Sequence, residues 1–461
     1  MINLFPMAQK VGSSGTCTQT GALIHHDLPA RTLPDAATAA ALPGRAFLPA
    51  MRAAARLLCA SVLGALAACA PHAPKPPAYS PLILISIDGY RADYLARGKS
   101  PALAALAASG VRAEALRPAF PTLTFPNHYT IVTGLYPDHH GIVNNRMVDP
   151  AIAVPFVYKD AATIGNAAWW GGEPLWVSVE KQGLHAATVF WPGSDVAIDG
   201  VRPEHWLKFD ITLSSEARVA QALQWLDLPE PQRPAFVTIY FDEVDRTSHT
   251  FGPGSAQADA AVARVDAALA HLLDGLKQRG LADTANLVVL SDHGQAPAGP
   301  DKVEVLDRTI DMKDVDLIST GVLAGLAAKP GHEARVERAL LAPHDHMRCW
   351  KKSSVPARLH YGSNPRIPPL LCLADDGWII NTQEVMDKPD HKISLGEHGY
   401  DNEDPAMGAL FVAHGPAFKR GLVVPEFDNV DIYPLLAAIL GIKAQPNDGD
   451  FNIVKPMLAK P

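Results

Sequence analysis

Three apolar, strand-like runs in the chain are each followed by side chains that bind metal ions. The runs are Leu82–Ile87 before Asp88, Phe236–Phe241 before Asp245 and His249, and Leu287–Leu290 before Asp292 and His293. Ligands of open α/β sheets gather beyond the carboxyl ends of the strands, so we expect these side chains to meet at one edge. Each cluster alone is more often a turn or an ordinary polar group, and only their recurrence predicts a site.

A fourth motif, Gly396-Glu-His398-Gly399, brings the set to three aspartates and three histidines. Mixed carboxylate and imidazole ligands suit Zn²⁺. The sequence therefore predicts a site for two Zn²⁺ ions per chain, which is the arrangement of a two-metal hydrolase.

The remaining pattern predicts an α/β protein. Further strands are expected at Ala187–Phe190 and Leu410–Ala413, and an amphipathic helix over Ser255–Gly280 with Ser255 as its cap and Gly280 as its stop. Strands that alternate with helices along the chain are typical of a sheet built from βαβ units. Residues 301–390 have weaker periodicity and several Pro and Gly, so we expect an inserted smaller subdomain there.

A hydroxyl nucleophile is expected in Phe120-Pro-Thr-Leu-Thr124-Phe-Pro-Asn-His128. A hydroxyl attacks phosphorus only when a metal ion ionises it, and Thr124 is our candidate. Pro126 is suited to the first turn of a helix whose amides favour an anion. From this motif alone, Thr122 or Thr124 as an ordinary helix cap is the better interpretation.

The run from Thr124 to Asn145, with Ser-Asp292-His293-Gly and Glu-His398-Gly-Tyr-Asp, resembles the nucleotide pyrophosphatase/phosphodiesterase family of the alkaline phosphatase superfamily. The likeness extends from about Pro81 to Asp448. It implies an alkaline-phosphatase-like central mixed sheet flanked by helices, in one catalytic domain over 81–455. It also implies hydrolysis of phosphodiester or phosphoanhydride bonds of nucleotides.

The resemblance also assigns roles to individual residues. One zinc would be held by Asp245, His249 and His398, and the other by Asp88, Asp292, His293 and the oxygen of Thr124. Asn145 would donate to a phosphoryl oxygen, while Phe125 and Tyr240 fall where relatives that act on nucleotides sandwich the base. The implied reaction is a double displacement through a covalent threonyl phosphate ester, with net retention.

Four positions depart from the family pattern. The family commonly has Lys at Leu123, Pro at Val244, Gly at Ser248 and Met at Gln295. No departure removes a ligand. Leu123 and Gln295 neighbour the reacting groups, so we expect them to bear on substrate preference.

Other functions fit the motifs less well. A sulfatase of the superfamily would need Cys or Ser followed by x-Pro-x-Arg, which Thr124-Phe-Pro-Asn-His128 does not provide. A phosphomonoesterase, a phosphonate hydrolase or a lipid-type phosphodiesterase shares the metal set and stays open. A binding protein with inactive metal sites is disfavoured because every expected ligand type is present.

The net charge of −8 makes nucleic acid an unfavourable docking partner, because phosphate backbones are held by clustered Lys and Arg. The expected partner is a small nucleotide or another phosphodiester. The natural substrate and the oligomeric state cannot be read from the sequence.

The amino-terminal region reads as processing sequence and not as fold. Residues 51–69 have a basic start, a short apolar core and Leu-Ala-Ala-Cys69, which resembles a bacterial lipoprotein signal. A cleaved export signal and a buried Ala-rich helix are the alternatives. We expect lipidation at Cys69, a Pro-rich tether over 70–80, a periplasmic or cell-envelope location, and a mis-assigned start at 1–50.

Several aromatic, histidine and cysteine side chains have two interpretations. Trp169, Trp170 and Trp176 fill a core or form a substrate wall, and we favour a structural or rim role. We expect structural roles for His128, His139 and His140. Cys349 and Cys372 either pair in an oxidising compartment or stay as buried thiols.

Overall fold

The computed structural model describes residues 79–389, 392 and 394–460. The expected signal, the lipidated Cys69 and most of the expected tether lie outside the described residues. Among the helices that are described, none has the length and apolar character needed to cross a bilayer.

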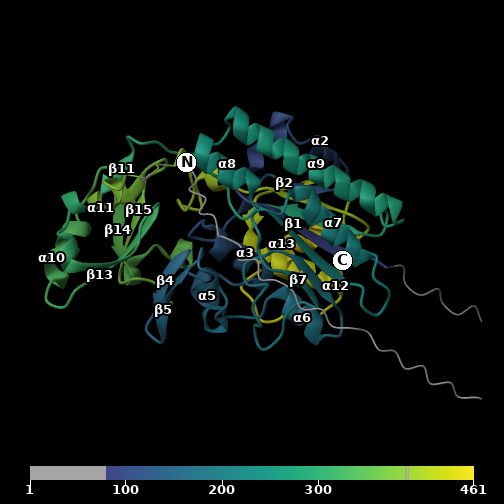
Figure 1. The fold of residues 1–461 in the computed structure, drawn as a ribbon, viewed down its shortest axis with the longest axis horizontal. Helices are drawn as coiled ribbons and strands as arrows, with labels where there is room; N and C mark the ends of the chain where they lie inside the picture. Colours follow the sequence, from purple (N-terminus) through teal and green to yellow (C-terminus); the bar gives the residue numbers. More distant parts are fainter. Residues whose placement is uncertain (1–78, 390–391, 393, 461) are drawn as a thin grey trace, which may run out of the picture. The chain divides into compact units, whose positions relative to one another are not determined.

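The fold is organised around a mixed eight-stranded sheet (Figure 1). Its order is β19 (Leu422–Val424), β2 (Val111–Ala113), β18 (Phe411–His414), β9 (Asn286–Leu290), β1 (Leu82–Ile87), β8 (Phe236–Phe241), β6 (Ala186–Val189) and β7 (His205–Leu207). The five strands from β9 to β7 run parallel to one another, and β18 is antiparallel to β9. The carboxyl ends of five neighbouring strands therefore share one edge.

Both faces of this sheet are buried, which explains its continuous apolar runs. Alternate residues of β1 enter different clusters: Leu82 and Leu84 pack on one face, and Ile83, Ile85 and Ile87 on the other. Helices cover each face and complete three layers (Figure 1).

The helix expected over Ser255–Gly280 is α9 (Ala256–Gln278), and it packs on one face of the sheet together with α2 (Pro101–Ser109) and α7 (Ser215–Leu226). The Ser255 side chain accepts a hydrogen bond from the Ala258 amide, as an N-cap does. The other face carries α3 (Thr124–Thr133), α6 (Leu175–Lys181) and α12 (Ile432–Leu440). The α/β prediction and the mixed central sheet are confirmed.

The segment inserted between β9 and β18 forms a smaller sheet of its own. Its four strands are antiparallel, in the order β12 (Val315–Ser319), β13 (Leu323–Ala328), β15 (Leu370–Ala374) and β14 (Met347–Lys351). The helix α10 (Glu333–Leu340) follows β13. A parallel pair, β11 (Val303–Val305) and β16 (Ile379–Asn381), joins the two ends of the segment. The weak helical periodicity of this segment reflects short antiparallel strands.

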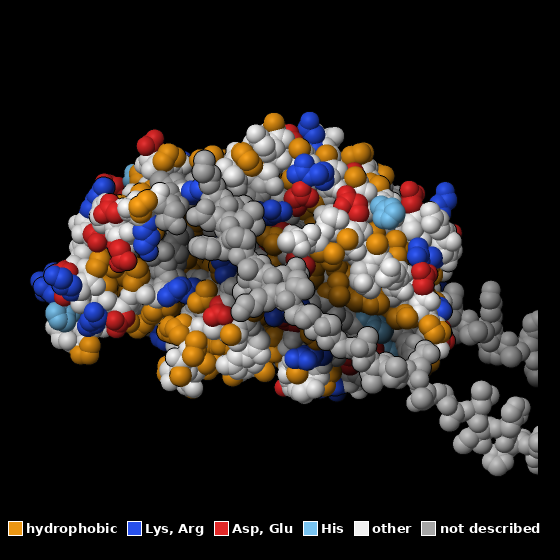
Figure 2. All heavy atoms as spheres, viewed as in Figure 1, with side chains coloured by type: hydrophobic (Ala, Val, Ile, Leu, Met, Phe, Trp, Pro, Cys, Tyr) orange, Lys and Arg blue, Asp and Glu red, His pale blue; other side chains and the backbone are white. Residues whose placement is uncertain are grey.

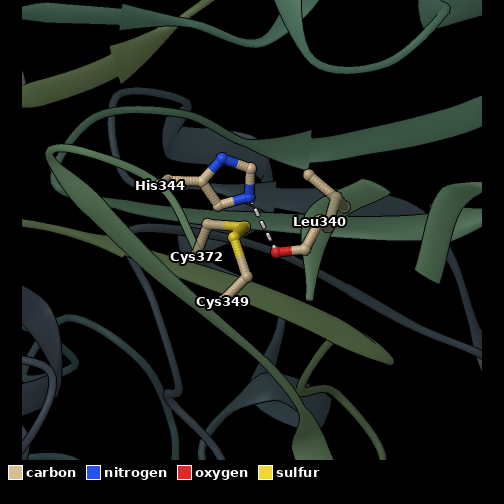
Figure 3. The surroundings of a disulfide bond; sticks show 4 residues. All are labelled: Leu340, His344, Cys349 and Cys372. Carbon is tan, nitrogen blue, oxygen red and sulfur yellow. Dashed lines mark hydrogen bonds between the residues drawn. A yellow bond between two sulfur atoms is a disulfide. The ribbon is translucent and has the colours of Figure 1, made fainter. Parts of the chain in front are cut away.

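Cys349 and Cys372 form a disulfide within this smaller sheet (Figure 3). They occupy directly opposed positions of β14 and β15. Close by, the ring of His344 hydrogen-bonds the Leu340 carbonyl at the end of α10, 2.9 Å away. The cross-link therefore ties two strands of the inserted sheet together.

The outer surface carries mixed charge. On the face drawn in Figure 2, basic and acidic side chains are interspersed. The charged side chains drawn on this face therefore form no broad basic field.

Removing the cross-link is expected to destabilise the protein. Replacing both Cys349 and Cys372 with Ala should lower the free energy of unfolding by about 3 kcal/mol, because a bond across 23 residues restricts the unfolded chain. The measurement is chemical unfolding with and without reductant. Reductant should lower the midpoint of the wild-type protein alone, and an equal response of both proteins would contradict the prediction.

Candidate metal centre

The shared edge of the parallel strands brings the expected ligands together. Asp88 directly follows β1, and Asp292 and His293 follow β9. After β8 the chain turns at once into α8 (Glu243–Phe251), where Asp245 and His249 lie one helical turn apart. Residues from three segments far apart in sequence thus meet beyond neighbouring strand ends.

A close approach of two backbones explains the glycine after Asp88. Gly89 has a φ of +69°, and a Cβ added there would lie 3.0 Å from the Cα of Asp245. The Gly89 amide also donates to Asp292 Oδ1 at 3.3 Å. The Asp-Gly pair is therefore a turn and part of the site at once.

His398 reaches the site through a short antiparallel pairing. Strand β10 (Ala296–Pro297), just after His293, pairs with β17 (Gly396–Glu397), just before His398. The rings of His293 and His398 stack with centroids 3.6 Å apart. Thr122 Oγ1 secures the returning chain, because it accepts from the Gly399 amide and donates to the Tyr400 carbonyl.

The six side chains form two adjoining groups. In the first, Asp245 Oδ1 lies 3.3 Å from His249 Nε2 and 3.7 Å from His398 Nε2. In the second, His293 Nε2 lies 3.4 Å from Asp88 Oδ1 and 3.0 Å from Asp292 Oδ2. Candidate ligand atoms of Asp88, Asp245 and His293 also lie within 4.8 Å of one another. The structure brings together all six residues expected from the sequence.

Each of the three histidines is held through Nδ1, so that Nε2 faces the carboxylates. The partners of Nδ1 are the Ser394 hydroxyl for His249, the Gly294 carbonyl for His293 and the Thr122 carbonyl for His398. Metal-binding histidines are commonly oriented in this way by their second nitrogen. The imidazoles are therefore pre-arranged as ligands.

Three carboxylates lie close together in the centre and repel one another. Burial, together with the charges of Asp292 and Asp245, raises the pKa of Asp88 well above its usual value. Burial opposes the charge of Asp245, but the neighbouring His249 outweighs it and lowers the Asp245 pKa to about 2. Burial, with His293 beside it, lowers the pKa of His398 to about 3. Bound cations would relieve the repulsion among the carboxylates.

Two buried carboxylate oxygens support the same conclusion. Asp88 Oδ1 and Asp292 Oδ2 are inaccessible to solvent and accept no hydrogen bond. Buried polar atoms without partners are rare and costly, and an ion is one way to satisfy them. Together with imidazole nitrogens, these oxygens form a donor set that fits divalent cations such as Zn²⁺.

Thr124 lies at the first position of α3, and its Oγ1 is 3.2 Å from His293 Nε2. The helix has no side-chain cap, because Leu123 occupies that position. The Thr122 hydroxyl is engaged with residues 399 and 400. The helix-cap interpretation of these threonines is therefore wrong, and the Thr124 hydroxyl faces the second group of ligands.

Asn145 is oriented by the start of the same helix. Its Oδ1 accepts a hydrogen bond from the Phe125 amide at 3.2 Å. The acceptor end of the amide is thereby occupied, which leaves the Nδ2 hydrogens to donate. The ring of Phe125 is half-buried and packs edge-on against Phe156 and Tyr158.

Tyr240 contacts the candidate site through its hydroxyl. It lies within β8, is 8% exposed, and donates its hydroxyl hydrogen to Asp88 Oδ2 at 2.6 Å. The hydroxyl thereby orients a candidate ligand carboxylate, and stacking of the ring on a base stays a prediction.

Sequence reasoning missed an exposed aromatic beside Tyr240. Phe209 follows β7 at the same strand edge, is 51% exposed, and its ring centroid lies 6.1 Å from that of Tyr240. Its sequence neighbours Lys208 and Asp210 are charged, and the loop has no strand or helix pattern. The sequence therefore does not mark Phe209 as part of the site.

His128 has the structural position expected from the sequence, and this position borders the site. It is fully buried, with Nδ1 hydrogen-bonded to the Thr124 carbonyl at 2.9 Å and Nε2 to Ser86 Oγ at 2.8 Å. The same Nδ1 lies 3.1 Å from Asp292 Oδ2. His128 therefore links the backbone of Thr124 to Ser86 of β1 and packs against a candidate ligand carboxylate.

The other residues with two interpretations have structural positions. Trp169, Trp170 and Trp176 are at most 4% exposed and belong to the core. His140 is buried and hydrogen-bonds Thr130 Oγ1, whereas His139 is exposed and pairs with Asp448.

Comparison with known proteins gives consistent matches. The model of the type I phosphodiesterase / nucleotide pyrophosphatase family matches residues 82–401. A venom phosphodiesterase of Macrovipera lebetinus is 39% identical over 83% of this chain and 46% of its own length. A fission-yeast (Schizosaccharomyces pombe) protein named as an uncharacterised pyrophosphatase/phosphodiesterase is 37% identical over 82% of this chain and 80% of its own.

A solved structure, that of murine ectonucleotide pyrophosphatase/phosphodiesterase 5, superimposes with a TM-score of 0.78 at 33% identity, over 82% of this chain and 100% of that one. An inactive threonine-to-alanine variant of the same murine protein has been solved in complex with AMP. The chain spans about half the length of the venom relatives.

The support given by His128 can be tested by its removal. His128→Phe keeps an aromatic ring but removes the buried hydrogen bonds of the imidazole to the Thr124 carbonyl and the Ser86 hydroxyl, so the free energy of unfolding should fall by about 2–4 kcal/mol. Denaturant unfolding measures this loss. His139→Phe, at an exposed site, should cost less than about 1 kcal/mol, and equal losses in the two variants would contradict the role given to His128.

Proposed function

Since the chain belongs to the type I phosphodiesterase / nucleotide pyrophosphatase family, we propose that it hydrolyses phosphodiester or phosphoanhydride bonds of nucleotides with two bound Zn²⁺ ions. The observation that carries the proposal is the position of the Thr124 hydroxyl, 3.2 Å from a candidate ligand nitrogen of a largely buried three-aspartate, three-histidine cluster.

The first group, Asp245, His249 and His398, would hold one ion, and Asp88, Asp292 and His293 the other. Bound divalent ions supply positive charge that favours ionisation of a hydroxyl and stabilises the entering and leaving oxygens of an in-line displacement. The unpartnered oxygens of Asp88 and Asp292 support this assignment.

Thr124 acts as the nucleophile. Its Oγ1 forms a bond to phosphorus as the bond from phosphorus to the leaving-group oxygen breaks, and a threonyl phosphate ester results. Water then breaks the ester and returns the hydroxyl, so the configuration at phosphorus is retained. The position of Thr124 at the start of α3 favours this chemistry, because free amides there attract a phosphoryl group.

Asn145 supplies a hydrogen-bond donor to a non-bridging phosphoryl oxygen. Its carbonyl oxygen is fixed by the Phe125 amide, so its Nδ2 hydrogens are the free end. A donor held in place before the reaction stabilises charge that develops on the phosphoryl group.

The substrate class rests on aromatic side chains near the centre. Phe125 is half-buried beside the nucleophile and Phe209 is exposed at the same strand edge, and aromatic rings stack on bases. The AMP complex of the murine relative supports a nucleotide. The choice of a diester follows from membership of a phosphodiesterase family.

We also propose that the protein is exported from the cytoplasm. The disulfide between Cys349 and Cys372 supports an oxidising compartment, because such bonds persist there. Anchoring through a lipidated Cys69 rests on the sequence motif alone.

Thr124→Ala should abolish turnover while zinc still binds. Activity is expected to fall below about a thousandth of wild type, since the covalent step loses its nucleophile. Hydrolysis and zinc content are measured on the same samples, with the exposed Thr320→Ala as control. Substantial turnover by a zinc-replete Thr124→Ala protein would discard the assignment.

The choice between diester and monoester is a separate test. Bis-p-nitrophenyl phosphate should be cleaved faster than p-nitrophenyl phosphate, because the chain belongs to a phosphodiesterase family. The measurement is kcat/KM for both esters with zinc-loaded protein. Faster cleavage of the monoester would establish a phosphomonoesterase instead.

A further inference from the structure

Gln295 lies directly behind the first group of ligands. Its side chain is fully buried, and its Nε2 donates to Asp245 Oδ1 at 3.2 Å. This is the same oxygen that faces His249 Nε2 and His398 Nε2. The amide therefore contacts the candidate ligand atom itself.

The backbone on either side of this contact cannot move freely. The Gln295 carbonyl accepts from the Arg91 guanidinium at 3.1 Å, and the Gly294 amide donates to the Met407 carbonyl at 2.8 Å. A Cβ at Gly294 would lie 2.1 Å from the Ala406 carbonyl oxygen, so the backbones pack directly on each other. The backbone that carries the Gln295 side chain is therefore held in place.

The other end of the amide is unsatisfied. Gln295 Oε1 is buried and accepts no hydrogen bond. Reversing the amide would set this oxygen against the carboxylate of Asp245, so the contact with Asp245 fixes its orientation.

We propose that Gln295 is a positioning residue that orients Asp245 and thereby sets the ion affinity of the Asp245–His249–His398 group. The inference rests on the proposed metal function and deepens it. The neutral amide adds no charge to the centre, so it acts by fixing the direction of the carboxylate. The Asp88–Asp292–His293 group has its own supports, Tyr240 and His128, and does not depend on Gln295.

Gln295→Met separates the two groups. Met has a similar length and is flexible enough to fill the same space, but it removes the N–H donor. It is also the residue that the family commonly has here, so the variant measures what the amide adds in this chain. The loss of an outer hydrogen-bond partner typically weakens metal binding by about 10–100-fold. We expect zinc affinity to fall by about 10-fold or more for one ion and to stay unchanged for the other.

The measurement is titration of metal-free protein with zinc against a chelator of known affinity, with circular dichroism to verify folding. Gln224→Met, at an exposed position of α7, is the matched control and should bind both ions as wild type does. Gln295→Asn keeps the amide but is too short to reach Asp245, and should reproduce the loss if Gln295→Met does not fold. Excess zinc should restore turnover in the variant with kcat unchanged.

Unchanged affinity for both ions, or an equal loss at both, would overturn the role of Gln295. Failure of the wild-type protein to bind two zinc ions would instead refute the proposed metal function. The two failures are thus distinguishable in one titration series.

Discussion

The repulsion among three closely placed carboxylates, two of them buried, is the constraint on which the rest of the site depends. Asp88, Asp245 and Asp292 are brought together by parallel strands whose carboxyl ends share an edge, and burial removes the water that would screen their charges. The fold must compensate this charge. It does so with three histidines oriented through Nδ1, and divalent ions would complete the compensation.

The residues that support the three aspartates are also buried. Tyr240, His128 and Gln295 each contact a different aspartate, and each is at least nine-tenths buried. Supports placed on β8, α3 and the segment after β9 connect the centre to three parts of the central core. The geometry of the candidate centre is therefore set by strands and helices of the core, whereas Phe209 lies on an exposed loop.

Much of the core could be predicted because its signals are local. β1 and β8 are continuous apolar runs with their observed bounds, and the ends of α9 are marked by Ser255 and Gly280. The six ligands were predicted because each follows a strand or lies in a distinctive motif. The short strands β2, β7 and β19 have only three residues each, too few for a readable period.

The features that could not be predicted from the sequence depend on tertiary contacts. The direction of the Tyr240 hydroxyl, the contact of His128 with Asp292 and the exposure of Phe209 follow from how separate elements pack. Pairing of Cys349 with Cys372 required the register of β14 against β15. Each of these is a relation between positions far apart in the chain, or between side chain and solvent, and no local pattern encodes it.

The central claim is that six side chains hold two ions next to one threonine hydroxyl. Anomalous diffraction at the zinc edge from crystals of zinc-loaded protein tests it most directly. The account predicts two peaks, one among Asp245, His249 and His398 and one among Asp88, Asp292 and His293 beside Thr124. A single peak, or peaks bound to other residues, would contradict it.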